Sequence, residues 1–455
     1  MTQLWSSPLP SSIRSAQPED NTSPLQGIWI RWNNLTTPEK SICAFIVLVP
    51  LWWIVGWTYT ILLIAGSCVA YEVWQSGGLR LQSPSLLVIS AFCFQLYKSF
   101  TTIINSKEVA HSSLLGLLTG VCLGFILWYV ESKKINIRTE VVSWAFSVLV
   151  IEMLVFWMVA QLMLGAPHFT PLRSLLGQLT EKGERFIPGA GTSNYLIPYW
   201  PDDKLPGGFV RFAFFFPVPE DFALIAGFTI LLALDIKKRI WSLPLLSAGI
   251  FLLFLSGTRS NWLALPIMLA VRFIFVARKI GGAALLSALI AFVGFFTLSL
   301  PVVTDLITDT YESTQAATGH LRQDSTEVRA KIYERTWNAI VDAPEDFLLG
   351  RGVPGLTVLP GYEPAKVGTH SFYLGTLLYR TGLLGTAIFL VFWTSLFLRL
   401  YRTRSSRPIS YLLMFFYISI AFIVMEVSMI TYLIILLSFT GDAPRKQLAE
   451  EMLDA

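Results

Sequence analysis

The chain leaves a long polar segment through GTHSFYL (368–374) and enters an apolar run that passes through YRTGLLG (379–385). The polar segment begins near residue 304, directly after another strongly apolar run. In a membrane protein, a polar stretch of this length between two apolar runs forms a large loop on one side of the bilayer. Its last residues bring His370 to the mouth of a helix. We expect the rest of the chain to form a helical framework around this histidine.

Composition also indicates a membrane protein. The 455 residues are 54% hydrophobic and 14% charged, with a mean hydropathy of +0.58, whereas soluble globular chains carry about 25% charged residues. Apolar runs of nearly 20 residues recur along the chain, and a run of that length spans a bilayer as a helix. The sequence therefore predicts an all-α, polytopic membrane protein. Its four cysteines lie in apolar runs without paired or metal-ligand spacing, so we expect them to be ordinary apolar side chains.

We expect about 12 transmembrane helices. The predicted spans lie at 42–55, 57–74, 84–104, 112–130, 141–164, 221–236, 240–256, 261–277, 281–303 and 371–398, and in the overlong run 409–439, which divides into two short helices near Glu426. A large loop at 304–369 then separates the ninth and tenth helices, and a second loop covers 165–220. The transmembrane domain is predicted at 41–440, with a disordered tail at 1–40 and a short tail at 441–455.

Basic residues gather in four short connections that all fall on one face of this topology: 133–138, 237–239, 278–279 and 399–407. Because loops rich in Lys and Arg stay in the cytoplasm, that face is predicted to be cytoplasmic. Both termini are then cytoplasmic, and the loops at 165–220 and 304–369 lie outside. The segments around the two loops are not similar to each other, which argues against a transporter built from inverted repeats.

Three ionisable residues are predicted at helix mouths on the outer face: Arg211, Arg259 and His370. Arg211 precedes a span, Arg259 lies in a turn of a few residues between two spans, and His370 opens the span after the large loop. A charge so close to hydrocarbon is costly unless it is solvated, paired or used. The alternative for the two arginines is snorkelling to the interface, and His370 taken alone is better explained as an ordinary interfacial histidine. Basic residues are normally enriched on the cytoplasmic side of a membrane protein. Two arginines on the outer side therefore favour a functional role.

The large loop carries a helical pattern at 325–342. Pro344 and the glycine-rich run GRGVPG (350–355) would end this helix. Arg329 and Arg335 lie on it, and a basic amphipathic helix resting on anionic headgroups is the alternative to a role in a site. The glycine run is also compatible with a phosphate cradle, but it lacks the Lys-Ser/Thr pair of a nucleotide-binding P-loop.

Arginines and a histidine on one face suit chemistry on a phosphate-containing substrate. The planar guanidinium group donates two parallel hydrogen bonds to phosphate oxygens. A histidine beside arginines is disfavoured as a cation, so its pKa is lowered and its neutral form can accept a proton. Such a site can activate a hydroxyl to displace a diphosphate leaving group.

Several stretches within 205–390 resemble the O-antigen ligase and polysaccharide polymerase family of bacterial inner membranes. LSGTRSNWLA (255–264) resembles the family's serine–arginine–small–tryptophan turn, and THSFYL (369–374) with RTGLLG (380–385) resembles its histidine and glycine segment. WNAI (337–340) followed by LGRG (349–352) resembles its loop helix and glycine turn, and Arg211 stands where the family has an arginine ahead of a helix start. Two positions depart from the family pattern: Ser371 replaces an asparagine, and Pro219-Glu220-Asp221 replaces proline–asparagine.

The resemblance implies a glycosyltransferase that needs neither metal nor other cofactor. It would transfer a glycan from a polyprenyl diphosphate carrier, such as undecaprenyl diphosphate, to an acceptor hydroxyl at the periplasmic face of the inner membrane. The arginines would hold the diphosphate, and the histidine would orient or deprotonate the hydroxyl. The implied catalytic residues are His370, Arg259 and Arg211, and the implied substrate-binding residues are Arg329, Arg335, Arg351 and Tyr373.

The resemblance also implies partners. These are the lipid-linked glycan donor, a glycan or lipid acceptor, the lipid bilayer and other polysaccharide-export proteins, but no nucleic acid. The product would be a lipopolysaccharide or an exopolysaccharide. A ligase passes the whole glycan to an anchor, whereas a polymerase joins repeat units by the same chemistry, and the sequence leaves both open with a slight preference for the ligase.

Two other classes remain as alternatives. A metal-dependent membrane glycosyltransferase needs outer carboxylates, for which Asp202-Asp203 and Asp305 with Asp309 are candidates. A solute or lipid transporter needs ionisable groups near the middle of the membrane, and the candidates for this role are Glu152, Glu426 and Arg272.

Overall fold

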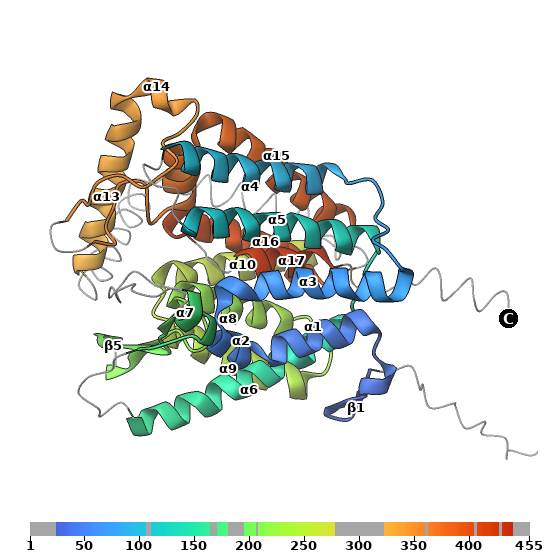
Figure 1. Cartoon of the computed structure of the whole chain (residues 1–455). Helices are drawn as coiled ribbons and strands as arrows, with labels where there is room; N and C mark the ends of the chain where they lie inside the picture. Colours follow the sequence, from blue (N-terminus) through green and yellow to red (C-terminus); the bar gives the residue numbers. More distant parts are fainter. Residues whose placement is uncertain are drawn as a thin grey trace, which may run out of the picture.

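The computed structural model describes residues 24–105, 111–163, 171–180, 195–205, 208–277, 323–359, 363–404, 407–426 and 430–439. The predicted span at 281–303, both tail ends and most of the first part of the large loop lie outside the described residues. The described part is mostly helical, and its long helices pack side by side (Figure 1).

The helices preceding the large loop are α1 (Thr37–Val47), α2 (Val49–Val55), α3 (Trp57–Ser76), α4 (Leu86–Asn105), α5 (His111–Ser132), α6 (Thr139–Met163), α7 (Leu175–Thr180), α8 (Pro219–Ala233), α9 (Arg239–Leu255) and α10 (Arg259–Ala277). Within and after the loop come α13 (Gln323–Asp342), α14 (Pro344–Phe347), the π-helix η4 (Phe372–Thr381), α15 (Gly382–Arg402), α16 (Ile409–Val424) and α17 (Ile430–Ser438).

Short antiparallel pairs of strands supplement the helices. In the described residues these are β1 (Leu25–Gln26) with β2 (Trp29–Ile30), β3 (Leu172–Arg173) with β4 (Tyr195–Leu196), and β5 (Tyr199–Lys204) with β6 (Val210–Phe212). None of these strands was predicted from the sequence, because five of them have only two or three residues and β5, with six, contains Pro201 and three charged residues instead of a hydrophobic alternation. The fold is nevertheless helical in its framework.

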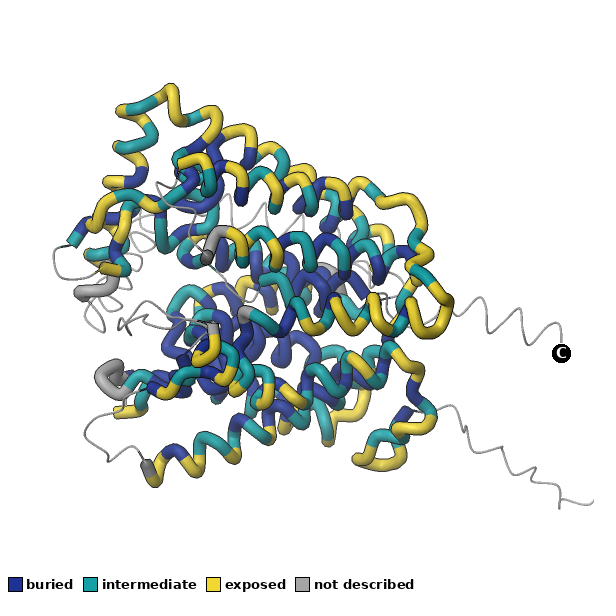
Figure 2. The backbone as a smooth tube through the Cα atoms, viewed as in Figure 1, coloured by how far each residue is buried: buried dark blue, intermediate teal, exposed yellow. Residues whose placement is uncertain are grey.

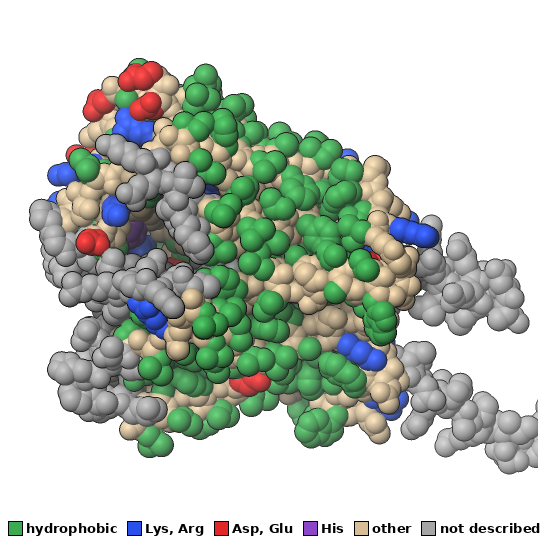
Figure 3. Space-filling view, viewed as in Figure 1, with side chains coloured by type: hydrophobic (Ala, Val, Ile, Leu, Met, Phe, Trp, Pro, Cys, Tyr) green, Lys and Arg blue, Asp and Glu red, His purple; other side chains and the backbone are tan. Residues whose placement is uncertain are grey.

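Four described helical segments are long and apolar enough to cross a membrane: Leu86–Asn105, Leu114–Ser132, Thr139–Leu162 and Phe372–Arg402. The pair α1 and α2, bent by 66° at its junction, would be a fifth. Hydrophobic side chains cover the middle of the molecular face in Figure 3, as a membrane-embedded surface requires. These features confirm a polytopic helical membrane protein, while the total of twelve spans stays a prediction.

The first helix begins before the predicted residue 42. Thr36 and Glu39 form a capping box, in which the Thr36 side chain accepts from the Glu39 backbone N–H and the Glu39 carboxylate accepts from the Thr36 N–H. This arrangement satisfies two of the free donors at the helix start. Glu39 also pairs with Arg138 at 2.7 Å, which ties the start of α1 to the start of α6.

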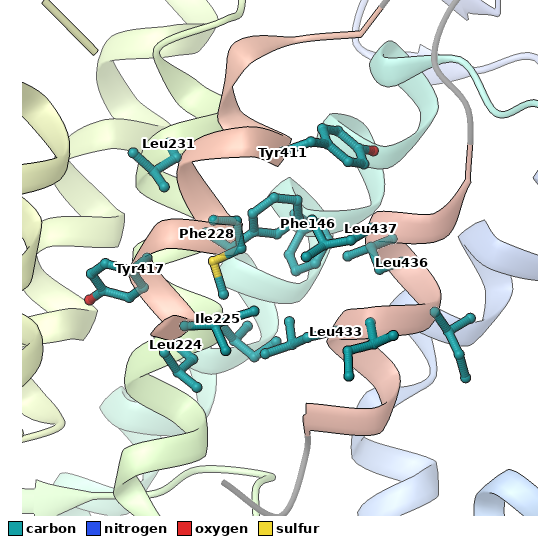
Figure 4. Packing of buried hydrophobic residues seen from close by; sticks show 14 of the residues in the cluster. Phe146, Leu224, Ile225, Phe228, Leu231, Tyr411, Tyr417, Leu433, Leu436 and Leu437 are labelled. Atoms are coloured by element: carbon teal, nitrogen blue, oxygen red, sulfur yellow. The ribbon is translucent and has the colours of Figure 1, made fainter. Parts of the chain in front are cut away.

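The innermost helix is α8. All its residues from Asp221 to Ala233 are buried, and Figure 2 shows the buried backbone running through the middle of the bundle. Phe228 packs edge-on against Phe146 of α6 and Tyr411 of α16 (Figure 4). A Cβ at Gly227 would lie 2.6 Å from the ring of Tyr417, so glycine is required for α16 to pack this closely. The first turn of α8 is therefore held in a fixed position.

The large loop is docked on the helices through two glycines with positive φ, Gly350 (+81°) and Gly382 (+64°). Their backbones meet directly, because a Cβ on Gly382 would lie 2.5 Å from the Gly350 nitrogen. The N–H groups of Arg351 and Gly352 donate to the carbonyls of Tyr379 and Arg380 at 3.0 and 2.8 Å. These donors are already used in docking, so the glycine run is not available as a phosphate cradle.

Replacing Gly382 by alanine is expected to lower the free energy of unfolding by more than about 2 kcal/mol, because φ there is left-handed and the new methyl group would strike backbone atoms. Thermal unfolding of the full chain in detergent measures the effect. The matched control is Gly116→Ala in α5, where nothing lies within 4 Å of the added Cβ and alanine favours a helix. Equal melting temperatures for the two variants would contradict the docking role.

Candidate functional site

Arg211 lies on β6 and is followed by four buried phenylalanines, Phe212 and Phe214 to Phe216. Its Nε donates to the carbonyl oxygen of Ser256 at 2.7 Å. A Cβ at Gly257 would lie 3.2 Å from both Cγ and Cδ of Arg211, so the missing side chain leaves room for the arginine stem. The turn between α9 and α10 is thus built against Arg211. This turn ends at Arg259, the first residue of α10, which is partly buried.

Glu220, in the first turn of α8, joins two arginines from distant segments. Its Oε1 lies 2.9 Å from Nη2 of Arg211 and 3.6 Å from Nη2 of Arg329 on α13. Arg329 also donates from Nη1 to the carbonyl oxygen of Val424 at 3.3 Å. The Arg211 and Glu220 side chains are only 10% and 17% exposed, so their charges interact with little solvent screening. Burial alone would raise the pKa of Glu220, but the two arginines hold it well below its ordinary value.

His370 precedes η4 and has a φ of +66°, a left-handed conformation that is uncommon for histidine. The backbone is held there by α13. The Tyr333 hydroxyl donates to the His370 carbonyl oxygen at 3.0 Å, and the Gly368 N–H donates to Oγ1 of Thr336 at 2.9 Å. Ser371 then caps η4 by accepting from the Leu374 N–H at 3.2 Å. The loop helix therefore sets the direction in which the His370 ring points.

The hydrogen bonds of Thr369 fix the tautomer of His370. Oγ1 of Thr369 lies 2.7 Å from the carbonyl oxygen of Lys366 and 2.8 Å from Nδ1 of His370. A carbonyl can only accept, so the single hydroxyl proton goes to Lys366. Oγ1 must then accept from Nδ1–H. We assign the proton of the neutral ring to Nδ1, which leaves the lone pair on Nε2 as the base.

The surroundings of His370 favour its neutral form. Burial lowers its pKa below the ordinary value of 6.5, and Arg329 lowers it further, while Glu426 and Glu220 act in the opposite direction. The sequence analysis predicted a lowered pKa from neighbouring arginines alone. The direction agrees, but burial is the larger cause.

The two loop-helix arginines differ in their surroundings. Arg329 is partly buried and contacts the first turn of α8, whereas Arg335 is exposed. These contacts favour Arg329 as the loop arginine of the site, a choice that the sequence left open. Arg329, Arg211 and Glu220 lie at the end of the bundle that carries α13 and β5, opposite the β1 hairpin (Figure 1). A histidine is visible among Lys and Arg side chains at this end (Figure 3).

Arg351 and Tyr373 have other contacts. The Arg351 guanidinium bonds to Asp346 at 3.0 Å and to the carbonyl oxygen of Ala339 at 3.2 Å, and it lies over the Tyr379 ring. Tyr373 packs against the core through Phe422, with ring centroids 5.8 Å apart. Both residues are engaged in the packing of the loop and of η4, and their role in substrate binding stays a prediction.

Two carboxylates interact electrostatically with His370 but were not predicted as part of its site: Glu220, and Glu426, which was a candidate only for the transporter alternative. Glu426 follows α16 and forms an ion pair with Arg380 of η4, and Lys98 of α4 interacts electrostatically with both. The only signals were the replacement of asparagine by Glu220 and the position of Glu426 in an apolar run. Neither signal shows which arginine pairs with each carboxylate.

The residues behind the alternative functions were also located. Among the described residues, no three His, Cys, Asp or Glu side chains gather in a group that could hold a metal ion. Asp202 and Asp203 lie on β5, and Asp305 and Asp309 lie outside the described residues. Of the transporter candidates, Arg272 pairs with Asp235 at 2.5 Å, and Glu152 lies on α6.

Comparison with known proteins identifies the central part of the chain. Residues 243–390 match a family model described as O-antigen ligase. This range contains Arg259, Arg329 and His370, while Arg211 and Glu220 precede it. A search of curated proteins gives no match. The chain therefore has the apolar helices of a membrane protein and contains, at residues 243–390, a region similar to the O-antigen ligase family.

Proposed function

We propose that this protein transfers a glycan from a polyprenyl diphosphate carrier to an acceptor hydroxyl, at the end of the bundle that carries α13. The match of residues 243–390 to the O-antigen ligase model supports a role in polysaccharide synthesis. The observation that supports this reaction best is the neutral His370, whose Nε2 is left as a base while Arg329 and Arg211 lie close by around Glu220. A base beside guanidinium groups suits displacement of an anionic leaving group.

In the proposed reaction, Nε2 of His370 takes the proton from the acceptor hydroxyl. The acceptor oxygen forms a bond to the anomeric carbon of the donor glycan as the bond from that carbon to the diphosphate oxygen breaks. The bonding electrons leave with the diphosphate, which gains one negative charge. Arg211, Arg259 and Arg329 stabilise this charge with charge-assisted hydrogen bonds. We place the site on the periplasmic face of the inner membrane, because the predicted loops lie opposite the basic connections.

Reconstitution tests the reaction. The full-length protein in lipid vesicles receives a polyprenyl diphosphate-linked glycan and an acceptor, with and without EDTA. The proposal expects free polyprenyl diphosphate and an elongated acceptor to appear in equal amounts in both samples. Loss of transfer with EDTA would favour a metal-dependent enzyme instead, and movement of the donor without cleavage would favour a transporter.

Deleting the gene distinguishes ligase from polymerase. Surface glycans of the deletion strain are separated on a gel. Single repeat units on the anchor would assign a polymerase, and long glycans that stay on the carrier and are missing from the anchor would assign a ligase. Arginines and a histidine in the ligase pattern support the second outcome.

The pH dependence follows from the lowered pKa of His370. Because the neutral ring is the active form, transfer should persist as the pH falls through 6.5 and decline only below that value. Arg329→Gln removes a neighbouring cation, so the pKa should rise and the acid limb should move to higher pH. Arg335→Gln, on the exposed side of the same helix, should leave the limb in place. Values of kcat/KM for the donor, measured from pH 5 to 8, give the comparison, and identical acid limbs for wild type and Arg329→Gln would contradict it.

A further inference from the structure

Glu220 is the meeting point of three parts of the protein. It belongs to the buried helix α8, pairs with Arg211 of the β6 segment and faces Arg329 of the loop helix. Both arginines direct a guanidinium nitrogen at the same carboxylate oxygen, Oε1. One oxygen shared by two guanidinium groups is also the arrangement in which a phosphate oxygen is bound.

The carboxylate therefore occupies the place where arginine-bound phosphate would lie. Two anions held by the same two cations repel each other, and at partly buried positions this repulsion is weakly screened.

We propose that Glu220 is an internal competitor of the donor diphosphate: it holds Arg211 and Arg329 together when the site is empty and gives up these contacts when a diphosphate binds. The proposal rests on the proposed function, because it takes the arginines to be the diphosphate ligands. Its consequence is that the wild-type protein binds diphosphate more weakly than its arginines allow. Weaker binding favours release of the polyprenyl diphosphate product after each transfer.

Glu220 is in a suitable position for this exchange. Its side chain is 17% exposed, so the carboxylate has contact with solvent and is not locked within the core. The backbone of α8 beneath it is buried on all sides, so the change is confined to the side chain. Arg329 keeps its contact with the Val424 carbonyl oxygen, which maintains the position of α13 when the carboxylate leaves.

Binding of farnesyl diphosphate, a short polyprenyl diphosphate, tests the proposal. Full-length wild type and Glu220→Gln in detergent are titrated calorimetrically, and Glu220→Asn provides a second neutral variant should the first fail to fold. The control is Glu345→Gln, which removes one exposed negative charge in α14 at the same end of the molecule. We expect about tenfold tighter binding for the neutral variants at position 220, a factor that corresponds to about 1.4 kcal/mol, and no change for the control.

The other outcomes separate the two proposals. Equal or weaker binding by folded Glu220→Gln or Glu220→Asn would overturn the competitor role and show that Glu220 only positions the arginines. Equal tightening by Glu345→Gln would also overturn it, because the effect would then come from net charge alone. Failure of the wild type and every variant to bind farnesyl diphosphate would instead contradict the proposed donor. Turnover gives a second, kinetic readout. Tighter binding should slow release of the polyprenyl diphosphate product, so kcat should be lower for the neutral variants at position 220.

Discussion

Replacing His370 by alanine is expected to lower glycan transfer by about 10²- to 10⁴-fold, the usual contribution of a positioned general base. The hydroxyl of the acceptor would keep its proton as the new bond forms, because no other neutral imidazole is placed at this point among the described residues. The measurement is the rate of polyprenyl diphosphate release by the full-length variant in lipid vesicles. Protein amount and membrane insertion are measured in parallel.

The conformation of His370 calls for a second variant. Its φ of +66° strains alanine, whereas asparagine adopts the left-handed region readily. His370→Asn should therefore fold as the wild type does but lose transfer to the same extent as His370→Ala. Wild-type rates in a folded His370→Asn protein would refute the proton-transfer role, and a loss confined to the alanine variant would assign the effect to the backbone.

Replacing Arg211 by glutamine is expected to reduce both transfer and stability. Loss of a charge-assisted hydrogen bond to the departing diphosphate removes about 1.5–3 kcal/mol, or about 10- to 100-fold in kcat/KM. The variant also leaves Glu220 with Arg329, at 3.6 Å, as its remaining ion-pair partner among the described residues. Breaking a largely buried pair by removing one partner costs about 3 kcal/mol, so the melting temperature should fall as well.

A double variant separates these two effects. Arg211→Gln with Glu220→Gln removes both charges, so no buried carboxylate is left without a partner. We expect the double variant to regain most of the melting temperature while transfer stays low. Recovery of transfer together with stability would show that Arg211 acts only by holding the fold.

Much of the framework was predictable, because membrane helices depend on local composition. Runs such as 84–104 and 141–164 coincide closely with α4 and α6, since about 20 apolar residues have few alternatives in a bilayer. The loop helix ends at Asp342, as Pro344 predicted, although it begins at Gln323 rather than 325. Signals that start or stop a helix act over a few residues, so they can be recognised in a single sequence.

The pairings within the site were not predictable in the same way. Glu220 and Arg329 are far apart in the chain, and no local pattern selects Arg329 over Arg335 on the same helix. The close approach of Gly350 to Gly382 likewise depends on how the loop docks. These features follow from tertiary packing, in which the partner is defined by geometry and not by spacing.

The burial of α8 divides the catalytic end into a fixed part and an adjustable part. A helix enclosed by close-packed neighbours cannot shift without opening cavities, so the backbone of Glu220, in the first turn of α8, is fixed. Arg329 and His370 belong instead to the large loop, which is joined to the bundle through η4 and glycine contacts. A change within the loop can therefore move Arg329 and His370 while the packing around α8 keeps Glu220 in place.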